Sequence, residues 1–386
     1  MLWGLLEMTA DTILHNARIV LADEIVEGSI VLRDGRIAGI DAGSGRTGED
    51  MGGDFIIPGL VELHTDHLEG HYAPRPKVRW NPIAAVLAHD AQVATAGITT
   101  VLDALRVGMD EDADLTSEDI RKLAEAIEDS VQQDRLRADH FIHLRCEVSA
   151  PDCLNAFANF DGDERVKLVS LMDHAPGQRQ FVNLETYAYY YQRKLKLTDR
   201  DFQKFCEKRM AESANNSRPN RIFISAACQE RGIVLASHDD ATVGHVDEAI
   251  AQGIRVAEFP TTAEAAKASK EAGLGVLMGA PNVMRGASHS GNVSARTLAG
   301  DGLLDILSSD YIPFSLIQSA FFIGDVVDGI SLPQAVALVS KNPAEAVGLT
   351  DRGVIEAGRR ADLVRVRVDD HVPVVRTVWR QGRRVA

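Results

Sequence analysis

The chain has 386 residues, of which 45% are hydrophobic and 25% are charged. This length exceeds that of a small single-core fold, and the composition is typical of a globular protein rather than a disordered or fibrous one. The formal net charge of −15 argues against a general affinity for nucleic acid or anionic membranes, because both rely on an excess of Lys and Arg.

The cysteines and the start of the chain bear on its compartment. The four cysteines show no CxxC spacing, so neither a zinc ribbon nor a dense disulfide framework is indicated. The apolar start MLWGLL is interrupted by Glu7 and lacks a basic region, which argues against a signal peptide, and Met8 is an alternative initiator. No uninterrupted apolar stretch approaches the roughly 20 residues that span a bilayer. We therefore expect a cytoplasmic protein without a nucleic-acid or membrane partner.

Both ends of the chain have the texture of short β-strands. Near the N-terminus, Asp34 and Gly35 separate two apolar runs, which is a strong hairpin signal. Similar β-rich runs return at residues 361–366 and 374–379, on either side of a polar turn. Two β-rich ends predict one small, discontinuous β-sandwich domain, made of residues 1–57 and 352–386.

Between these ends, eight short apolar runs alternate with helical patterns. The runs are too uniformly hydrophobic for half-exposed strands, as expected of a parallel sheet that is buried on both faces. One intervening segment, from Ile120 to Val131, repeats apolar residues at helical spacing. The count favours an α/β fold of the TIM type, with a (β/α)₈ barrel over residues 58–351. The runs are residues 60–63, 98–102, 141–144, 167–172, 233–236, 254–257, 275–278 and 304–307.

Residues 178–222 do not fit a minimal barrel. This stretch contains a cluster of tyrosines, a helix-start signal at Thr198 and a polar segment at residues 215–220 that is typical of a loop. We expect a helical insertion above the barrel rim. A cap over the active site and a contact in a homo-oligomer are equally compatible with the pattern.

Side chains that can bind a metal ion follow five of the eight predicted strands. The carboxyl ends of parallel strands meet at one rim, where TIM-barrel enzymes hold their active sites. One such residue alone is more often a helix cap or a solvated group, but their joint placement indicates a site. Imidazole and carboxylate ligands suit Zn, Mn, Fe or Ni in a catalytic site with an open position. The residues are His64 and Asp66 after the first strand, Glu147 after the third, Asp173 and His174 after the fourth, His238, Asp239 and Asp240 after the fifth, and Asp310 after the eighth.

The other histidines are harder to assign. His67, His71 and His89 lie near the predicted rim but outside the strand register, so both a site role and a structural role stay open. For His15 and His140, a packing or surface role is the simpler interpretation. By contrast, His64 and Asp66 are two residues apart, so on one strand they would face the same side and bind one ion.

Two segments resemble the motifs of a known superfamily. Residues 57–64, Ile-Pro-Gly-Leu-Val-Glu-Leu-His, look like the PGxxDxHxH opening of the amidohydrolase superfamily, and residues 353–364 resemble its C-terminal GxIxxGxxADLV return. Asp66 stands where the superfamily has its second metal-binding His. Together with this substitution, further blocks closely resemble the PhnM-type branch of the superfamily. These blocks begin at His174, Ser237, Gly279, Ser288 and Ser308.

The resemblance covers nearly the whole chain and implies a reaction. Members of the PhnM-type branch belong to the carbon–phosphorus lyase pathway, and they hydrolyse ribose 1-methylphosphonate 5-triphosphate to the 5-phosphate and pyrophosphate. It also implies one or two divalent metal ions, with Zn as the first expectation and Mn, Fe or Ni as alternatives.

The same resemblance implies roles for the rim residues. Superfamily histidines usually come from strands five and six, whereas here they follow strands four and five. Either a strand is miscounted or His174 contacts substrate instead. The implied roles are His64 and Asp66 as ligands of a first ion, Glu147 as a bridge between two ions, His174 and His238 as ligands of the second, and Asp310 as the general base that orients water.

A triphosphate also needs cationic and hydrogen-bonding partners, because an acidic protein would otherwise repel a polyanion. Basic residues follow several rim strands, although ordinary surface charge accounts for at least half of them. The loop at residues 286–292 is small and rich in donors, so its N–H groups can face an anion. The expected partner is thus a phosphorylated small molecule, and the expected contacts are Arg75, Lys77, Arg179, Arg285, Ser288 and His289.

Two alternatives stay open. Hydrolysis of a C–N bond in a cyclic amide, an N-acyl amino acid or an amino-heterocycle is the commoner superfamily chemistry. A metal-free relative that acts as a scaffold is the other, and the retained His, Asp and Glu residues argue against it.

Overall fold

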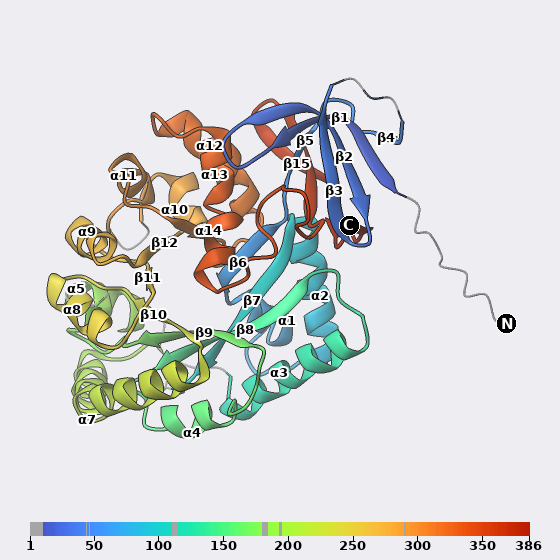
Figure 1. The fold of residues 1–386 in the computed structure, drawn as a ribbon. Coiled ribbons are helices and arrows are strands. Elements are labelled where there is room, and N and C mark those ends of the chain that lie inside the picture. Colours follow the sequence, from blue (N-terminus) through green and yellow to red (C-terminus); the bar gives the residue numbers. More distant parts are fainter. Residues whose placement is uncertain are drawn as a thin grey trace.

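The computed structural model of the chain describes residues 11–386 apart from residues 44, 46, 110–114, 180–183, 193–194 and 289–290. Figure 1 shows a barrel surrounded by helices and, beside it, a smaller part that combines strands from both ends of the chain. Each part contains one eight-stranded sheet. Within the described residues, no helix has the length and hydropathy needed to cross a membrane.

The smaller sheet is sandwich-like and joins the two ends of the chain, as predicted. Strand β5 lies between β1 and β14, so N-terminal and C-terminal strands share hydrogen bonds. Asp34 and Gly35 connect β2 and β3 with φ values of 50° and 75°, as a tight two-residue hairpin requires. The strands are β1 (Thr12–Val20), β2 (Ile25–Arg33), β3 (Arg36–Ala42), β4 (Glu49–Asp50), β5 (Phe55–Pro58), β14 (Leu363–Asp369), β15 (Val372–Arg380) and β16 (Arg383–Arg384).

The second sheet is the predicted TIM-type barrel. Its eight strands are parallel, follow one another in chain order, and each overlaps one of the predicted apolar runs. A bridge between Thr65 and Asp310 brings the last strand back to the first, and the N–H of Asp310 donates to the carbonyl of His64 at 3.1 Å. The strands are β6 (Leu60–Thr65), β7 (Ile98–Val107), β8 (Asp139–Glu147), β9 (Val166–Met172), β10 (Val234–His238), β11 (Val256–Glu258), β12 (Gly275–Gly279) and β13 (Ile306–Ser308).

Helices cover the outside of the barrel. The predicted amphipathic segment forms α3, which buries Ile120, Leu123 and Ile127, whereas Val131 near its end is exposed. The described helices are α1 (His67–Tyr72), α2 (Pro82–Thr95), α3 (Ser117–Gln132), α4 (Cys153–Ala158), α5 (Leu184–Tyr187), a π-helical turn η2 (Ala188–Gln192), α7 (Asp199–Arg231), α8 (Val243–Ala251), α9 (Ala263–Glu271), α10 (Ala280–Arg285), α11 (Ala295–Gly300), α12 (Ser315–Val326), α13 (Leu332–Ala337) and α14 (Lys341–Ala346).

Helix α7 corrects one expectation from the sequence. Its start is as predicted, because Thr198 is the N-cap and its Oγ1 accepts a hydrogen bond from the N–H of Asp201. The prediction of a loop at residues 215–220 is wrong, because this stretch lies inside the helix together with Pro219. The limits of the predicted insertion at residues 178–222 stay a prediction.

The polar face of α7 explains the error. Ser213, Asn216 and Asn220 are three or four residues apart, so they lie on one side of the helix. The hydroxyl of Ser213 donates to Asp173 at 2.8 Å, and the amides of Asn216 and Asn220 donate to backbone carbonyls of residues 148–149 at 3.0 and 2.9 Å. Hydrogen bonds rather than apolar contacts hold this face, so hydropathy does not reveal its period.

Asp139, at the start of β8, links the barrel to the C-terminal segment. Its carboxylate contacts the guanidinium groups of Arg352 at 2.7 Å, Arg360 at 2.7 Å and Arg380 at 3.5 Å. Burial alone would raise the pKa of Asp139, but the charges of Arg360 and Arg352 outweigh burial and lower it. The ionised carboxylate therefore stabilises the contact between the two parts of the molecule.

We expect Asp139→Asn to lower the free energy of unfolding by about 2 to 4 kcal/mol, because three guanidinium groups lose a shared countercharge. The folded pKa lies below the unfolded value of about 3.9, so this contribution is present above about pH 4 and is lost as the pH falls through the folded pKa. Denaturant titrations of both proteins at pH 7 and pH 3 measure the effect.

The matched control is Asp11→Asn, which removes an exposed ion pair with Arg33 at 2.6 Å. Exposed pairs contribute at most about 1 kcal/mol, so this variant should stay close to the parent protein. Equal losses in the two variants would contradict a special role for Asp139.

Candidate metal centre

A cavity of about 230 Å³ opens at the carboxyl ends of the barrel strands. TIM-barrel enzymes hold their active sites at this end of the barrel. Several predicted site residues meet in the cavity wall, and Arg145 and Phe259 join them there. The predicted residues in the wall are His64, His174, His238, Asp239, Arg285, Ser288 and Asp310.

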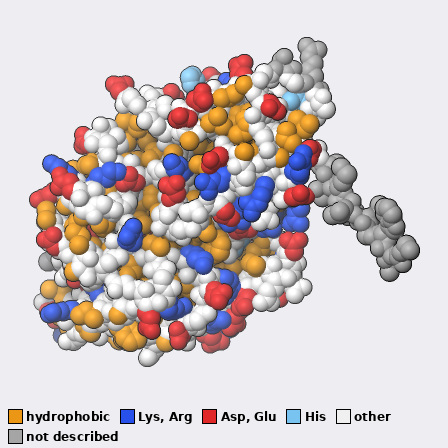
Figure 2. Space-filling view, viewed as in Figure 1, with side chains coloured by type: hydrophobic (Ala, Val, Ile, Leu, Met, Phe, Trp, Pro, Cys, Tyr) orange, Lys and Arg blue, Asp and Glu red, His pale blue; other side chains and the backbone are white. Residues whose placement is uncertain are grey.

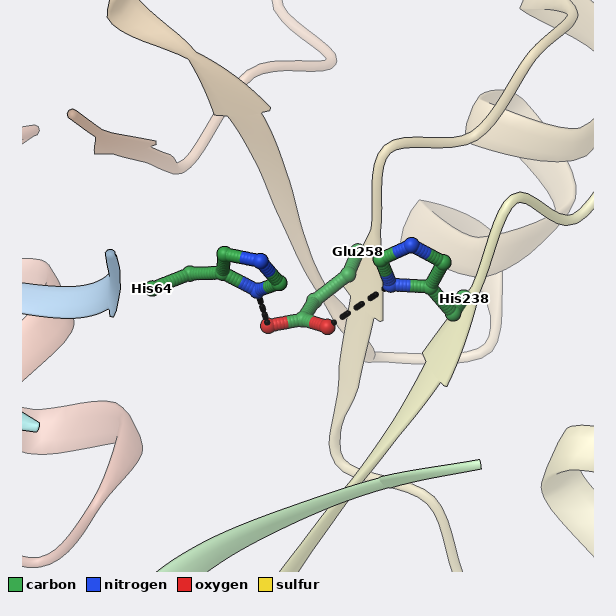
Figure 3. A group of neighbouring side chains, drawn as sticks. All are labelled: His64, His238 and Glu258. Carbon is green, nitrogen blue, oxygen red and sulfur yellow. Dashed lines mark hydrogen bonds and ion pairs between the residues drawn. The ribbon is translucent and has the colours of Figure 1, made fainter. Parts of the chain in front are cut away.

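Glu258, at the end of β11, connects two histidines from other strands (Figure 3). Its two carboxylate oxygens lie 3.1 Å from Nδ1 of His64 and 3.1 Å from Nδ1 of His238. Ser170 donates a further hydrogen bond at 2.6 Å. Burial alone would raise the pKa of Glu258, but the imidazoles, His64 first, lower it well below its usual range. The carboxylate therefore stays ionised and fixes both rings.

Glu147, at the end of β8, does the same for a third histidine. One oxygen lies 2.6 Å from Nδ1 of His174, and the other accepts hydrogen bonds from the backbone N–H of His174 at 3.1 Å and from Ser149 at 2.6 Å. The guanidinium of Arg209 lies 3.8 Å away. Burial opposes ionisation of Glu147, but His174 and the nearby arginines hold its pKa below the usual range.

The three histidines therefore share one arrangement. In each, a buried carboxylate holds Nδ1, which leaves Nε2 as the atom able to bind an ion. The Nε2 atoms of His174 and His238 lie 3.7 and 3.5 Å from Oδ2 of Asp239. These donors are chemically suited to a divalent ion that prefers nitrogen and carboxylate ligands. The residues present at this rim therefore fit a catalytic divalent ion.

Strained backbone turns place several of these side chains at the rim. Asp239, Phe259 and Asp310 follow barrel strands with φ values of 57°, 51° and 54°, a region that side chains other than glycine rarely adopt. Each is held there by a backbone hydrogen bond from its N–H to a neighbouring strand, at 2.9, 2.8 and 3.1 Å. Strain of this kind concentrates at functional sites.

Glu62 fixes the place where the barrel closes. Its carboxylate accepts from the N–H of His64 at 2.6 Å and from the N–H of Ser309 at 2.6 Å, so it ties β6 to the segment that carries Asp310. Complete burial raises the pKa of Glu62 to about 7. Burial also raises the pKa of Asp310, whose side chain lines the cavity.

Comparison with known proteins places the chain in a family. A family model described as the amidohydrolase family matches residues 235–386. Alpha-D-ribose 1-methylphosphonate 5-triphosphate diphosphatase of Escherichia coli (strain K12) is 50% identical over 377 residues, which cover 97% of this chain and 100% of that protein. The chain belongs to the amidohydrolase family.

Solved structures support the fold of this amidohydrolase. A 5-methylcytosine deaminase from Klebsiella pneumoniae matches with a TM-score of 0.65 and 16% identity, covering 97% of this chain and 98% of that one. An N-acetyl-D-glucosamine-6-phosphate deacetylase from Mycobacterium smegmatis matches with a TM-score of 0.64 and 16% identity, covering 98% and 100%. Identities this low show the fold alone.

The order of the barrel strands shows which strands precede His174 and His238 in this amidohydrolase. Strands β9 and β10 are the fourth and fifth of the barrel, so His174 and His238 do follow strands four and five. The sixth strand, β11, supplies Glu258. No strand was miscounted, so the alternative that His174 contacts substrate rather than metal stays open.

Two predicted metal ligands have other partners in the structure. Strand β6 ends at Thr65, so the expectation that Asp66 faces the same side as His64 does not apply. The carboxylate of Asp66 accepts a hydrogen bond from Arg145 at 3.2 Å instead. Glu147 directs its oxygens to His174 and Ser149, as described above. The ligand roles of these two carboxylates stay predictions.

The predicted substrate contacts are spread more widely. Among the described residues, the wall of the cavity includes neither Arg75 nor Lys77, which lie between α1 and α2. Arg179 is buried, pairs with Asp240 and Glu248, and lines a separate cavity of about 440 Å³. His289 lies outside the described residues. Arg75, Lys77, Arg179 and His289 therefore stay predicted contacts.

Sequence reasoning missed Glu258, Glu62 and Arg145 as site residues. Glu258 ends a short apolar strand and Glu62 lies inside one, and carboxylates are almost never fully buried unless they are paired. A charged residue within an otherwise apolar barrel strand was the available signal. Arg145 gave none, because its partner Asp66 lies 79 positions away along the chain.

We expect Glu258→Gln to lower the affinity for a divalent ion by about 10- to 100-fold, because the neutral amide no longer fixes the rings of His64 and His238. Competition with a chelator, followed by metal analysis, measures the change. Glu264→Gln on the exposed side of α9 is the control and should leave the affinity unchanged. An unaltered affinity in Glu258→Gln would contradict the idea that Glu258 supports metal binding by fixing these two rings.

Proposed function

We propose that this amidohydrolase hydrolyses alpha-D-ribose 1-methylphosphonate 5-triphosphate to the 5-phosphate and pyrophosphate, as a step of the carbon–phosphorus lyase pathway. The observation that carries the proposal is the 50% identity to the Escherichia coli protein of that name, over 97% of this chain and 100% of that protein. Because the alignment covers nearly the whole length of both proteins, it includes nearly all of the elements that build the cavity.

We propose that one or two divalent ions bind at the cavity, with zinc as the first candidate and Mn, Fe or Ni as alternatives. One group of donors supports this proposal, namely His174, His238 and Asp239. His64 lines the same cavity with its Nδ1 paired to Glu258, which leaves its Nε2 as a further donor, so either one ion or a pair is compatible with the arrangement. Such an ion would make water more acidic and offset charge on phosphoryl oxygens.

Asp310 is the proposed general base. Its side chain lines the cavity, and Glu62 holds the adjacent Ser309. Asp310 would accept a proton from a water molecule as that water attacks the α-phosphorus. The anhydride bond between the α- and β-phosphoryl groups would then break and release pyrophosphate. The proton would then pass to solvent or to the departing pyrophosphate.

Arg285 and Ser288 are the proposed phosphate contacts. Both line the cavity, and the side chain of Arg285 is exposed at the end of α10. Arg145 lies in the same wall and adds a guanidinium, which it shares with Asp66. In a protein with a net charge of −15, these groups supply the local positive charge that a triphosphate needs.

We further propose that the protein acts in the cytoplasm on this phosphorylated small molecule, without a nucleic-acid or membrane partner. The acidic net charge supports this proposal. A homo-oligomer stays a prediction.

The decisive experiment incubates the metal-loaded chain with the ribosyl triphosphate and, separately, with cyclic amides, N-acyl amino acids and amino-heterocycles. We expect phosphorus NMR to show pyrophosphate and the 5-phosphate appearing together, and only with metal present. Turnover of an amide without turnover of the triphosphate would replace the proposal with C–N hydrolysis. A chain that binds no metal and turns over nothing would instead favour the scaffold alternative.

We expect Asp310→Asn to reduce turnover of the triphosphate by at least about 100-fold, because the amide cannot accept the proton. Its metal content should stay near that of the parent protein. Steady-state kinetics combined with metal analysis separate the two effects. Loss of metal in this variant would show that Asp310 is a ligand rather than a separate base.

We expect Arg285→Ala to raise KM for the triphosphate by about tenfold or more, because a charge-assisted hydrogen bond contributes about 1.5 to 3 kcal/mol. Metal content should not change. Arg255→Ala is the matched control, because Arg255 is exposed and precedes β11, at the opposite end of the barrel. An unchanged KM in Arg285→Ala would count against its contact with phosphate.

A further inference from the structure

Three histidines outside the cavity meet where α1 packs against α2. His67 and His71 are four residues apart on α1, so they lie on the same face of that helix, and His89 lies on α2. The ring centroids are 5.2 Å apart for His67 and His71, 6.4 Å for His67 and His89, and 6.1 Å for His71 and His89. His89 is fully buried, whereas the other two are half-buried.

A buried carboxylate holds one nitrogen of His89. Nε2 of His89 donates to Asp103 at 2.8 Å, and the other oxygen of Asp103 pairs with Nδ1 of His140 at 2.8 Å. When the imidazole is neutral, donation from Nε2 leaves a lone pair on Nδ1. Within the described part of the chain, Nδ1 of His89 is buried and has no hydrogen-bond partner. Buried nitrogens without a partner are uncommon in proteins and call for an explanation.

We propose that His67, His71 and His89 form a second binding site for a divalent metal ion, separate from the cavity. Three neutral imidazoles favour zinc or another nitrogen-preferring ion over magnesium or calcium. Zinc binds imidazole nitrogen at about 2.0 to 2.1 Å in a tetrahedral arrangement, which places two ligand nitrogens about 3.3 Å apart and their ring centroids about 5 Å apart. Two sides of the observed triangle of rings are more than 1 Å wider, so the half-buried His67 and His71 would have to turn toward His89 when the ion binds.

The partners of these rings match those of metal ligands. A ligating histidine commonly donates its second ring nitrogen to a carboxylate or carbonyl oxygen. His89 does so to Asp103, and Nε2 of His71 lies 2.9 Å from Oε1 of Gln92, which leaves Nδ1 of His71 for the ion. The histidines at i and i+4 on one helix have the spacing of metal-binding pairs.

An ion at this place would stabilise a weak element. Helix α1 has only six residues, and the side chain of its N-cap, Asp66, makes no capping hydrogen bond. Such short helices depend on tertiary contacts rather than on their own propensity. A bond from α1 through the ion to His89 on α2 would fix the segment that directly follows His64 and Asp66.

The test counts zinc ions on the full chain. Equilibrium dialysis with zinc, followed by metal analysis, should show one zinc fewer in a His67→Ala, His71→Ala double variant than in the parent chain. The same loss of one zinc should appear when His67→Ala and His71→Ala are added to a His238→Ala chain, in which the cavity donors are already disrupted. His371→Ala, whose side chain is 86% exposed, is the matched control and should lose no zinc.

Two further measurements keep the test decisive. If the double variant does not fold, His67→Gln alone should weaken the same zinc at least tenfold. Cobalt, as a spectroscopic substitute, should give a visible absorption band that the His67 and His71 variants lose. Equal zinc counts and equal cobalt spectra with and without these histidines would overturn the proposal. The readout is metal content, so failure of the proposed hydrolysis would leave this result unaffected.

Discussion

The buried carboxylate of Glu258 sets the geometry of the cavity. A carboxylate removed from water needs hydrogen-bond donors on both oxygens, and His64, His238 and Ser170 provide them from three other strands. These donors can converge only when β6, β9, β10 and β11 have their native order in the barrel. Satisfying one buried charge therefore orients two histidines, and it couples the assembly of the barrel to the assembly of the site.

The same device recurs around the barrel. Glu147 holds Nδ1 of His174, and Asp103 holds Nε2 of His89, so in each case a buried carboxylate takes one ring nitrogen and leaves the other. Low dielectric strengthens such pairs, and the carboxylates stay ionised despite their burial. The histidines therefore have defined orientations before any ion arrives, which reduces the reorganisation needed on binding.

How far the sequence predicted these features depends on the kind of interaction. The eight apolar runs and the Asp34-Gly35 turn are local signals, and the barrel and the hairpin follow them closely. The convergence of His64, His174, His238 and Asp310 in one cavity follows from the rule that parallel strands end at one rim. Pairings between distant residues were not predictable in this way. The polar face of α7 is stabilised by loops that precede it in the chain. Strand alternation does not predict the direction of Asp66, because β6 ends one residue earlier.

Closure of the barrel shows why the site and the fold cannot be separated. The last strand meets the first through the bridge from Thr65 to Asp310, and Glu62 adds hydrogen bonds to His64 and Ser309 across the same seam. Burial raises the pKa of Glu62 to about 7 even though both backbone donors hold its carboxyl, so without these donors the buried carboxylate would cost still more stability. The donors are in place only when the seam is closed. A change that opens the seam would therefore displace His64 and Asp310 together, and the most constrained part of the barrel is also the part that positions the proposed base.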